Sequence, residues 1–313
     1  MEFRKLGSSN LQVSRVGFGC WPMSGHGYGA ADDDKSLRAV QEALDLGINF
    51  FDTADVYGFG HSETILSKAL GSRRHDVVIA TKFGVGWDLQ SRTFKDCSSG
   101  HVLKALEGSL RRLRIDSIPL YQIHWPDTQT PISETMETLL KCRESGKIQH
   151  LGCCNFPLPL IRDATSVCEL VSIQVEFGVG RLQNMALLRD CHQSQHMGTI
   201  IYGVLGRGIY SGKYDFDSQF GENDTRDRDE QFKGERLIRN LGTVEGLRKI
   251  GTLYRRPPAQ VAVRWAIESP FVTSAIVGMK NAEQVRDSVE ALDWELEPEH
   301  FRWLLDLDAT GSV

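Results

Sequence analysis

The chain has 313 residues, of which 41% are hydrophobic and 25% charged, and its formal net charge is −5 with neutral histidines. This acidic balance argues against nucleic acid as a partner, because nucleic-acid-binding proteins usually carry a basic excess. No window approaches the roughly 20 apolar residues of a membrane span. No apolar run follows the first residues, as it would in a signal peptide. We therefore expect a cytoplasmic protein with no membrane partner.

Short apolar runs alternate with amphipathic stretches along the chain, after an opening hairpin predicted from residues 2–6 and 11–13 around a Gly-Ser-Ser-Asn turn. The runs that predict strands are 16–19, 48–52, 76–81, 118–124, 148–153, 171–175, a segment within 198–205, and 272–277. The stretches that predict helices are 36–46, 63–70, 99–113, 132–145, 158–165, 184–192, 236–254, 258–268 and 282–292. The polar residues 216–231 predict a loop.

Eight strand-then-helix units in series predict a parallel sheet. Right-handed crossovers repeated eight times close such a sheet into a (β/α)8 TIM barrel. The length fits one barrel with extended loops, so we expect residues 1–313 to form a single domain, with the N-terminal hairpin closing the barrel bottom. No G-x-G-x-x-G follows the first strand, which argues against a Rossmann dinucleotide site.

Four polar residues follow three successive predicted strands. Asp52 and Tyr57 follow the second strand, Lys82 the third and His124 the fourth. Functional groups in such barrels lie at the carboxyl ends of the strands, so we expect these side chains to share one rim. A lysine ammonium stabilises a nearby phenolate, an aspartate holds that lysine, and a histidine donates to a carbonyl oxygen. Together they predict a proton donor for carbonyl reduction.

Taken singly, each of these residues has a plainer explanation. An aspartate at a strand end is often a loop cap, and a buried histidine is often a core residue. Lys82 equally suits the nucleophile of a Schiff-base aldolase barrel, and this alternative stays open. It leaves Tyr57 and His124 without a role, whereas carbonyl reduction uses all four residues.

Four segments carry a likeness to a known family. Residues 47–58 (GINFFDTADVYG) resemble G-x-x-x-x-D-T-A-x-x-Y-G, and residues 146–156 (GKIQHLGCCNF) resemble G-K-I-R-x-I-G-V-S-N-F. Residues 205–214 resemble L-G-x-G-x-L-x-G-K-Y. The chain thus resembles the aldo-keto reductases over nearly its whole length, and residues 232–236 resemble a bacterial subgroup. The resemblance implies reduction of an aldehyde or ketone, with Asp52, Tyr57, Lys82 and His124 as a catalytic tetrad.

The same resemblance implies NADP(H) as the cofactor. It assigns the nicotinamide carboxamide to Asn155 and Gln174, ring stacking to Tyr202, and the adenosine 2′-phosphate to Lys280, with Arg286 second. Tyr202 also suits a barrel-core aromatic. The residues expected at the cofactor are Cys20, Trp21, Asp52, Cys154, Asn155, Gln174, Tyr202, Gly203, Leu205, Gly206, Gly208, Lys213, Gly278, Lys280, Gln284 and Ser288.

The sequence gives less information about the substrate pocket. Trp21, Trp87 and Trp125 follow strand ends and are candidates for its wall, although packing under loops explains them equally well. Sugars, polyols and small aldehydes all remain open as substrates, as do the direction of the reaction and the oligomeric state. A second alternative is a regulatory subunit that binds an ion channel and senses the nicotinamide without turnover.

The seven cysteines are irregularly spaced and include no C-x-x-C pair. The odd count and the spacing argue against a zinc knuckle or a redox pair. We therefore predict no metal site, and reduced, mostly buried thiols.

Overall fold

A computed structural model describes residues 1–25, 27–221 and 224–310. Eight parallel strands close into a barrel in the order β10-β11-β12-β3-β4-β5-β8-β9, and this confirms the predicted (β/α)8 fold. The barrel strands are β3 (Val16–Gly19), β4 (Phe50–Asp52), β5 (Val78–Phe83), β8 (Ile118–Ile123), β9 (Ile148–Cys154), β10 (Ser172–Glu176), β11 (Gly198–Tyr202) and β12 (Ser274–Gly278).

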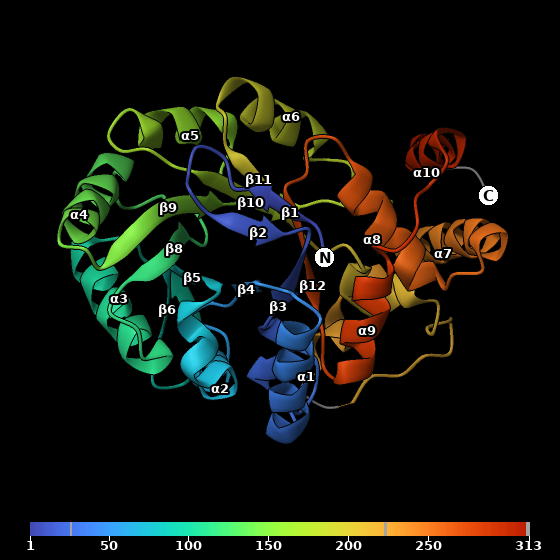
Figure 1. Ribbon diagram of the computed structural model, residues 1–313, viewed down its shortest axis with the longest axis horizontal. Coiled ribbons are helices and arrows are strands. Elements are labelled where there is room, and N and C mark those ends of the chain that lie inside the picture. The colour runs from blue at the N-terminus through green and yellow to red at the C-terminus, as the bar shows by residue number, and fades with distance from the viewer. Residues whose placement is uncertain (26, 222–223, 311–313) are drawn as a thin grey trace.

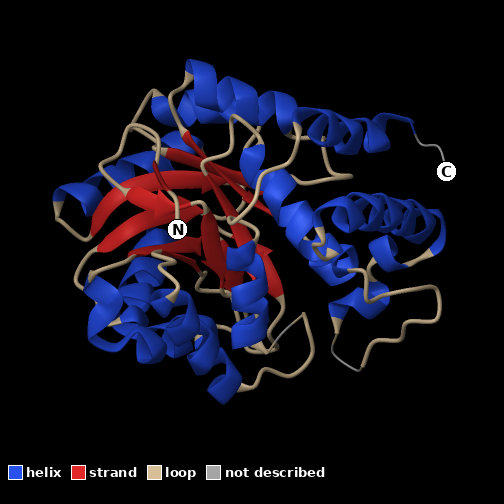
Figure 2. Cartoon of the chain, turned by 45° about the vertical axis from the view of Figure 1, so that its right-hand side comes forward, coloured by secondary structure: helices blue, strands red, loops and turns tan. Residues whose placement is uncertain are grey.

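Helices surround the barrel on the outside (Figure 1), and Figure 2 shows the strands as an inner layer within them. They are α1 (Asp33–Asp45), α2 (His61–Leu70), α3 (Ser99–Leu113), α4 (Ile132–Glu144), α5 (Leu158–Thr165), α6 (Met185–Ser194), α7 (Gly234–Tyr254), α8 (Pro258–Glu268), α9 (Ala282–Glu290) and α10 (Pro298–Thr310). Their apolar faces pack against the strands in one large buried cluster, which is the expected core of a barrel of this kind. Within the described ranges, no helix is long and apolar enough to cross a membrane.

The N-terminal hairpin closes one end of the barrel, as predicted. Its strands β1 (Phe3–Lys5) and β2 (Gln12–Ser14) pair antiparallel and lie across the middle of the barrel in Figure 1. Leu6 and Val13 are fully buried and pack into a second apolar cluster inside the barrel, beside Phe50, Leu120 and Ile200. The hairpin therefore supplies the apolar plug of the end opposite the strand carboxyl termini.

Element ends differ from the sequence prediction by a few residues. The predicted helix 36–46 begins at Asp33, because the Asp32 carboxylate accepts a hydrogen bond from the Lys35 amide at 3.0 Å and caps the helix earlier. The predicted strand 76–81 runs instead from Val78 to Phe83. These shifts move no barrel strand out of its place.

Several short elements were not predicted. A hairpin of β6 (Val85–Trp87) and β7 (Thr93–Lys95) follows β5, and α10 follows α9. The predicted loop 216–231 contains the 3₁₀ helices η4 (Thr225–Arg228) and η5 (Glu230–Phe232), with residues 222–223 outside the described part. The other 3₁₀ helices are η1 (Trp21–Ser24), η2 (Gly71–His75) and η3 (Gly206–Ser211). Apart from α10, which has 13 residues, these segments carry too few residues for a periodic pattern.

We expect Gly7→Ala to lower the free energy of unfolding by about 2–4 kcal/mol, since it combines a left-handed backbone with a steric clash. Gly7 has φ +55°, and a Cβ there would lie 2.3 Å from the Val171 carbonyl oxygen. Gly146→Ala is the matched control: its φ is +79° and no atom lies within 4 Å of an added Cβ. Urea titration measures both variants, and equal losses would show that the close approach at the hairpin is unimportant.

Candidate active site

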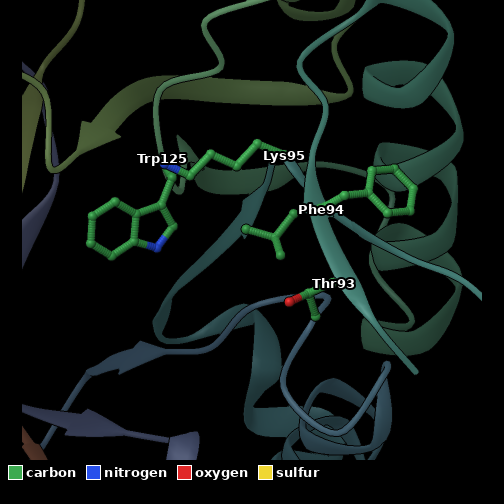
Figure 3. Close-up of a pocket in the computed structure, with 5 residues that line it drawn as sticks. Thr93, Phe94, Lys95 and Trp125 are labelled. Atoms are coloured by element: carbon green, nitrogen blue, oxygen red, sulfur yellow. The ribbon is translucent and has the colours of Figure 1, made fainter. Parts of the chain in front are cut away.

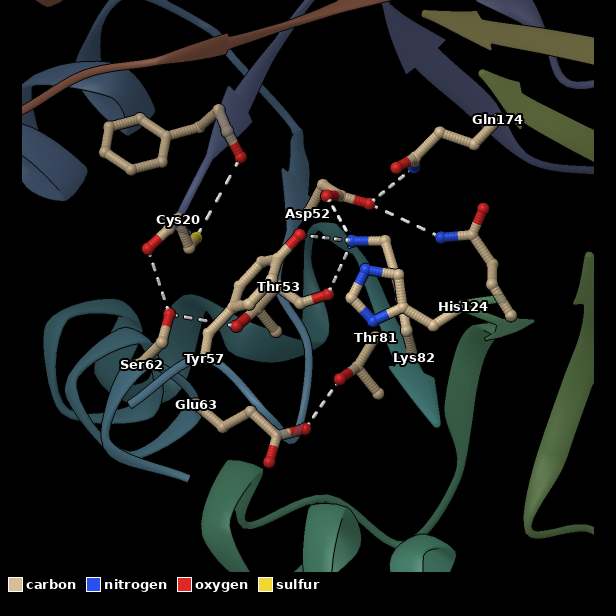
Figure 4. A network of polar contacts seen from close by, with 12 residues as sticks. Cys20, Asp52, Thr53, Tyr57, Ser62, Glu63, Thr81, Lys82, His124 and Gln174 are labelled. Atoms are coloured by element: carbon tan, nitrogen blue, oxygen red, sulfur yellow. Dashed lines mark hydrogen bonds and ion pairs between the residues drawn. The ribbon is translucent and has the colours of Figure 1, made fainter. Parts of the chain in front are cut away.

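The four predicted catalytic side chains meet at the carboxyl ends of β4, β5 and β8 (Figure 4). Lys82 lies at the centre and is fully buried. Its Nζ donates to Asp52 Oδ1 at 2.6 Å, to the Thr53 carbonyl at 2.9 Å and to Tyr57 Oη at 3.4 Å. All three ammonium hydrogens thus have acceptors, which is the condition for burying this charge.

Two glutamine amides hold the other oxygen of Asp52. Its Oδ2 accepts from Gln174 Nε2 at 2.8 Å and from Gln122 Nε2 at 3.4 Å. Gln174 was expected at the nicotinamide carboxamide, and in this structure one end of its amide is directed at Asp52. Gln122 was not predicted at all, although its place at the end of β8 was a signal that could have found it.

Burial dominates the pKa of the phenol. Burial raises the pKa of Tyr57 to about 12, against the opposing effect of the Lys82 ammonium, and Asp52 adds to the rise. Lys82 thus lowers the pKa of the phenol, as expected of a nearby cation, but burial raises it by more. Burial is also the largest single effect on Lys82 and lowers its pKa, but Asp52, Tyr57 and Cys154 together outweigh burial, so the pKa of Lys82 is raised. The pair is thus a charged Lys82 beside a protonated Tyr57.

His124 is held neutral. Burial and the nearby Lys82 ammonium lower the pKa of His124 well below its usual range. Its ring meets that of Tyr57 edge-on at a centroid distance of 5.7 Å. Its Nδ1 is buried and has no hydrogen-bond partner among the described residues. A neutral imidazole in this position can donate one hydrogen bond without bringing a second cation near Lys82.

Hydrogen bonds and close packing hold the turn that carries Tyr57 in place. Thr53 and Ser62 share a hydrogen bond of 3.0 Å, and Ser62 also donates to the Cys20 carbonyl at 3.1 Å. Gly58 has φ +61°, and a Cβ there would lie 2.4 Å from the Ser24 carbonyl oxygen. The turn therefore needs glycine at this position.

A buried carboxylate supports the same region. Glu63 is fully buried and accepts from Thr81 Oγ1 and Arg112 Nε, each at 2.6 Å. These contacts connect α2 to β5 and α3 directly behind the strand that carries Lys82 (Figure 4). These contacts were not predicted, because the sequence around a helical glutamate does not show whether its side chain is buried.

The three candidate tryptophans have different surroundings. Trp21 stacks on Tyr57 with ring centroids 6.0 Å apart, and Trp125 stacks beside His124 at 6.5 Å. Trp87 instead packs against Phe59 at 5.6 Å. Trp21 and Trp125 therefore flank the catalytic rings, while Trp87 packs against the turn that holds Tyr57.

The residues expected at the cofactor form an arc on one side of the rim. Apart from Asp52, which ends β4, they end or follow β9, β10, β11, β12 and β3, which are consecutive neighbours in the barrel. Within this arc, Asn155 Nδ2 donates to the His124 carbonyl at 3.1 Å, and Tyr202 Oη donates to Asn155 Oδ1 at 2.9 Å. Cys154 is buried, and burial raises the pKa of its thiol, while Lys82 opposes the rise. All seven cysteines are buried and free.

Two backbone amides of the glycine-rich turn after β11 already donate hydrogen bonds to carbonyls of the same turn. The Gly206 amide donates to the Gly203 carbonyl and the Gly208 amide to the Leu205 carbonyl, both at 2.8 Å. Both amides are thus paired within the turn in this structure, and their role at a cofactor stays a prediction. Arg207, between them, instead lies over the Trp21 ring at 5.3 Å and pairs with Asp229 at 2.9 Å.

Lys280 lines a cavity of about 200 Å³ at the beginnings of α1 and α9. Its Nζ donates to the Tyr28 carbonyl at 2.6 Å, and burial together with Arg226 lowers its pKa. Lys35 lines the same cavity and was missed by the sequence analysis. Arg286, the second candidate, pairs with Glu42 at 2.8 Å on the exposed side of α9 and does not line the cavity.

The remaining residues expected at the cofactor differ in their contacts and exposure. Gln284 lines the cavity and its Oε1 accepts from the Lys280 amide at 2.8 Å. Ser288 donates to the Gln284 carbonyl within its own helix at 2.8 Å. Lys213 is exposed and lies over the Tyr214 ring at 4.9 Å, and Gly278 is the exposed last residue of β12.

Two loops meet above this arc. The Gly27 carbonyl accepts from the Thr225 amide at 3.3 Å and from its hydroxyl at 2.8 Å. Arg226 lies over the Tyr28 ring at 5.2 Å and pairs with Asp224. The predicted loop 216–231 is thus tied to the segment after η1.

Comparisons with known proteins identify the family to which the sequence is similar. A family model described as the Aldo/keto reductase family matches residues 15–308. The chain is 32% identical to the aldo-keto reductase YhdN of Bacillus subtilis over 302 residues, covering 96% of this chain and 91% of that protein. It is 30% identical over 300 residues to a protein of Schizosaccharomyces pombe named aldo-keto reductase yakc, NADP(+), covering 94% of this chain and 87% of that protein.

Two solved structures have the same fold as this chain. A glycerol dehydrogenase from Gluconobacter oxydans matches with a TM-score of 0.90 and 32% identity, covering 99% of this chain and 97% of that one. An aldo-keto reductase from Bacillus halodurans, in its holo form, matches with a TM-score of 0.82 and 28% identity, covering 98% and 96%. The fold therefore has close counterparts among solved structures.

We expect Lys82→Met to lower the free energy of unfolding by about 3–5 kcal/mol, because Asp52 would remain as a buried carboxylate without its cation. The matched control is Arg92→Met, which removes an exposed cation paired with Asp88 at 2.7 Å. We expect this control to leave unfolding nearly unchanged. Thermal or urea unfolding measures both, and an unchanged Lys82→Met protein would contradict the buried pair.

Proposed function

The chain belongs to the aldo/keto reductase family, and on that premise we propose that it is an NADP(H)-dependent oxidoreductase that reduces an aldehyde or ketone to an alcohol, with Tyr57 as the general acid. The observation that carries the proposal is the Lys82 ammonium within hydrogen-bond distance of both Asp52 and Tyr57. NADPH, when bound, would supply the hydride.

Tyr57 is suited to hold the proton that the carbonyl oxygen receives. With a pKa of about 12, the phenol keeps its proton at neutral pH. As the O–H proton moves to the carbonyl oxygen, the phenolate that forms is stabilised by the Lys82 ammonium beside it. Asp52 keeps that ammonium charged and fixed in direction. The negative charge that develops is thus balanced by a cation already present.

His124 is proposed to orient the carbonyl. A neutral imidazole N–H directed at the carbonyl oxygen would polarise it and align it with the Tyr57 hydroxyl. The ring is held next to Tyr57, and Asn155 fixes its main chain through the His124 carbonyl. Trp21 and Trp125 would limit the access of water to this oxygen from two sides.

The residues of the arc fit a nicotinamide dinucleotide. The buried end of the arc offers the Asn155 and Gln174 amides for the carboxamide and the partly exposed Tyr202 ring for stacking. The other end offers the cavity lined by Lys280 and Lys35, at the beginning of α9, for the 2′-phosphate. A cation and a helix N-terminus are both favourable for a phosphate dianion.

The aldolase alternative fits less well. A Schiff-base lysine must lose its proton to act as a nucleophile, and enzymes achieve this by lowering its pKa. The pKa of Lys82 is raised by Asp52, and its three hydrogen bonds hold it in the ammonium form. We therefore favour a role for Lys82 as a fixed cation.

We expect Tyr57→Phe to reduce the rate of aldehyde reduction by roughly 10²–10⁴-fold, the usual contribution of a general acid. The wild-type protein and the variant would be assayed on a panel of aldehydes, ketones and alcohols by nicotinamide absorbance. Tyr121→Phe is the control, since Tyr121 is also buried and its hydroxyl has no partner among the residues described. A wild-type protein that turns over none of the panel would favour the regulatory-subunit alternative, and an active Tyr57→Phe would exclude this tyrosine as the acid.

We expect NADPH to be preferred to NADH, with Lys280→Ala raising the Kd for NADPH by about ten- to a hundred-fold and leaving that for NADH nearly unchanged. The reason is that only NADPH carries the 2′-phosphate. Arg286→Ala is the control, because Arg286 is engaged with Glu42 outside the cavity. Fluorescence titration measures both cofactors, and equal weakening of the two by Lys280→Ala would show that Lys280 does not read the phosphate.

A further inference from the structure

An open cavity of about 350 Å³ lies against the β6–β7 hairpin and Trp125 (Figure 3). It is lined by Val85, Thr93, Phe94, Lys95 and Trp125. Four of these residues belong to the β6–β7 hairpin, which follows β5, and Trp125 follows β8. The arc instead occupies β9 to β3, so a dinucleotide in the arc would leave this cavity free.

The cavity is within reach of the reacting centre. Trp125 directly follows His124, and their rings stack at 6.5 Å, while the His124 ring lies 5.7 Å from that of Tyr57. A substrate whose carbonyl oxygen meets Tyr57 and His124 can therefore extend past the Trp125 ring into the cavity. Trp125 is 38% exposed and offers an aromatic face to the body of such a molecule.

The cavity contains one charged side chain, and it is a cation without a carboxylate partner. Lys95 Nζ lies 5.3 Å from the centroid of the Trp125 ring, and Figure 3 shows its side chain running toward that ring. The other cation of the hairpin, Arg92, is paired with Asp88 at 2.7 Å. Across the described parts of the chain, no carboxylate forms an ion pair with Lys95.

The carboxylates that follow Lys95 and Trp125 in the sequence, Asp96 and Asp127, have other hydrogen-bond partners. Asp127 accepts from the Cys97 amide at 3.0 Å, the Gln129 amide at 2.9 Å and the Thr130 hydroxyl at 2.7 Å. Asp96 accepts from the Ser98 amide at 2.9 Å. Lys95 therefore keeps its charge available to a ligand.

The backbone of the hairpin is held firmly. Gly86 pairs with Phe94 across the two strands, and a Cβ on Gly86 would lie 2.6 Å from the Phe94 ring. The ring thus packs directly over the Gly86 backbone, and Val85 pairs with Lys95 beside it. This packing fixes the backbone from which the exposed Lys95 side chain extends over the cavity.

We propose that this cavity is a substrate subsite for a carboxylate at the far end of an apolar or aromatic aldehyde, and that Lys95 is its specificity-determining residue. The inference rests on the proposed function, since it assumes that the carbonyl binds at Tyr57 and His124. Trp125 and Val85 contact the apolar body, and the Lys95 ammonium and the Thr93 hydroxyl contact the carboxylate. The charge complementarity is specific, because a neutral substrate of the same shape gains only the apolar contact.

The test compares 4-carboxybenzaldehyde with its methyl ester, which has nearly the same shape and no charge. We expect the wild-type kcat/KM to favour the acid, and Lys95→Gln to lower kcat/KM for the acid by roughly two- to five-fold, as suits a partly exposed charge pair, mainly through KM. The value for the ester should not change. Lys95→Glu should make the ester the better substrate. Arg92→Gln is the matched control, since it removes a cation of the same hairpin outside the cavity.

Failure of this inference is distinguishable from failure of the proposed function. If wild type reduces both aldehydes and Lys95→Gln lowers both values equally or neither, the subsite is wrong and the reductase function stands. If wild type reduces neither aldehyde, the proposed function fails for this substrate class. Calorimetric binding of terephthalate then still tests the cavity: weaker binding to Lys95→Gln than to Arg92→Gln supports the cationic subsite, and equal binding overturns it.

Discussion

The burial of one lysine ammonium governs the centre of this barrel. Lys82 is fully enclosed, and the cost of removing its charge from water is met only because Asp52, the Thr53 carbonyl and Tyr57 all accept from it. Those acceptors belong to β4 and to the turn after it, so the ion pair also fixes the end of β4 against β5. The direction of the Tyr57 hydroxyl, and hence the geometry of any reaction at it, follows from that constraint.

The tetrad could be predicted because neighbouring parallel strands end at one rim, so Asp52, Lys82 and His124 had to be close once the strands were identified. Burial could not be predicted in the same way. The raised pKa of Tyr57 and the burial of Glu63 depend on what packs around them, which the sequence around each residue does not show. The β6–β7 hairpin was missed because two strands of three residues carry no periodic pattern.

Many donors that the family resemblance assigns to a cofactor already have partners within the protein. Lys280 donates to the Tyr28 carbonyl, and the amides of Gly206 and Gly208 donate within their own turn. Binding of a dinucleotide would therefore exchange hydrogen bonds, and an exchange contributes little net free energy for each bond. The affinity would depend chiefly on charge contacts with the phosphates and on stacking of the nicotinamide.

The β6–β7 hairpin lies apart from the ends of the barrel strands, and this affects which residues can change during evolution. The residues that surround the reacting oxygen belong to barrel strands and to a tightly braced turn, where most substitutions disturb the packing. The hairpin begins only after β5 has ended at Phe83, and Lys95 projects from its second strand. Mutations in residues 85–95 can therefore accumulate and reshape the cavity beside Trp125, while the buried pair of Lys82 and Asp52 is left intact.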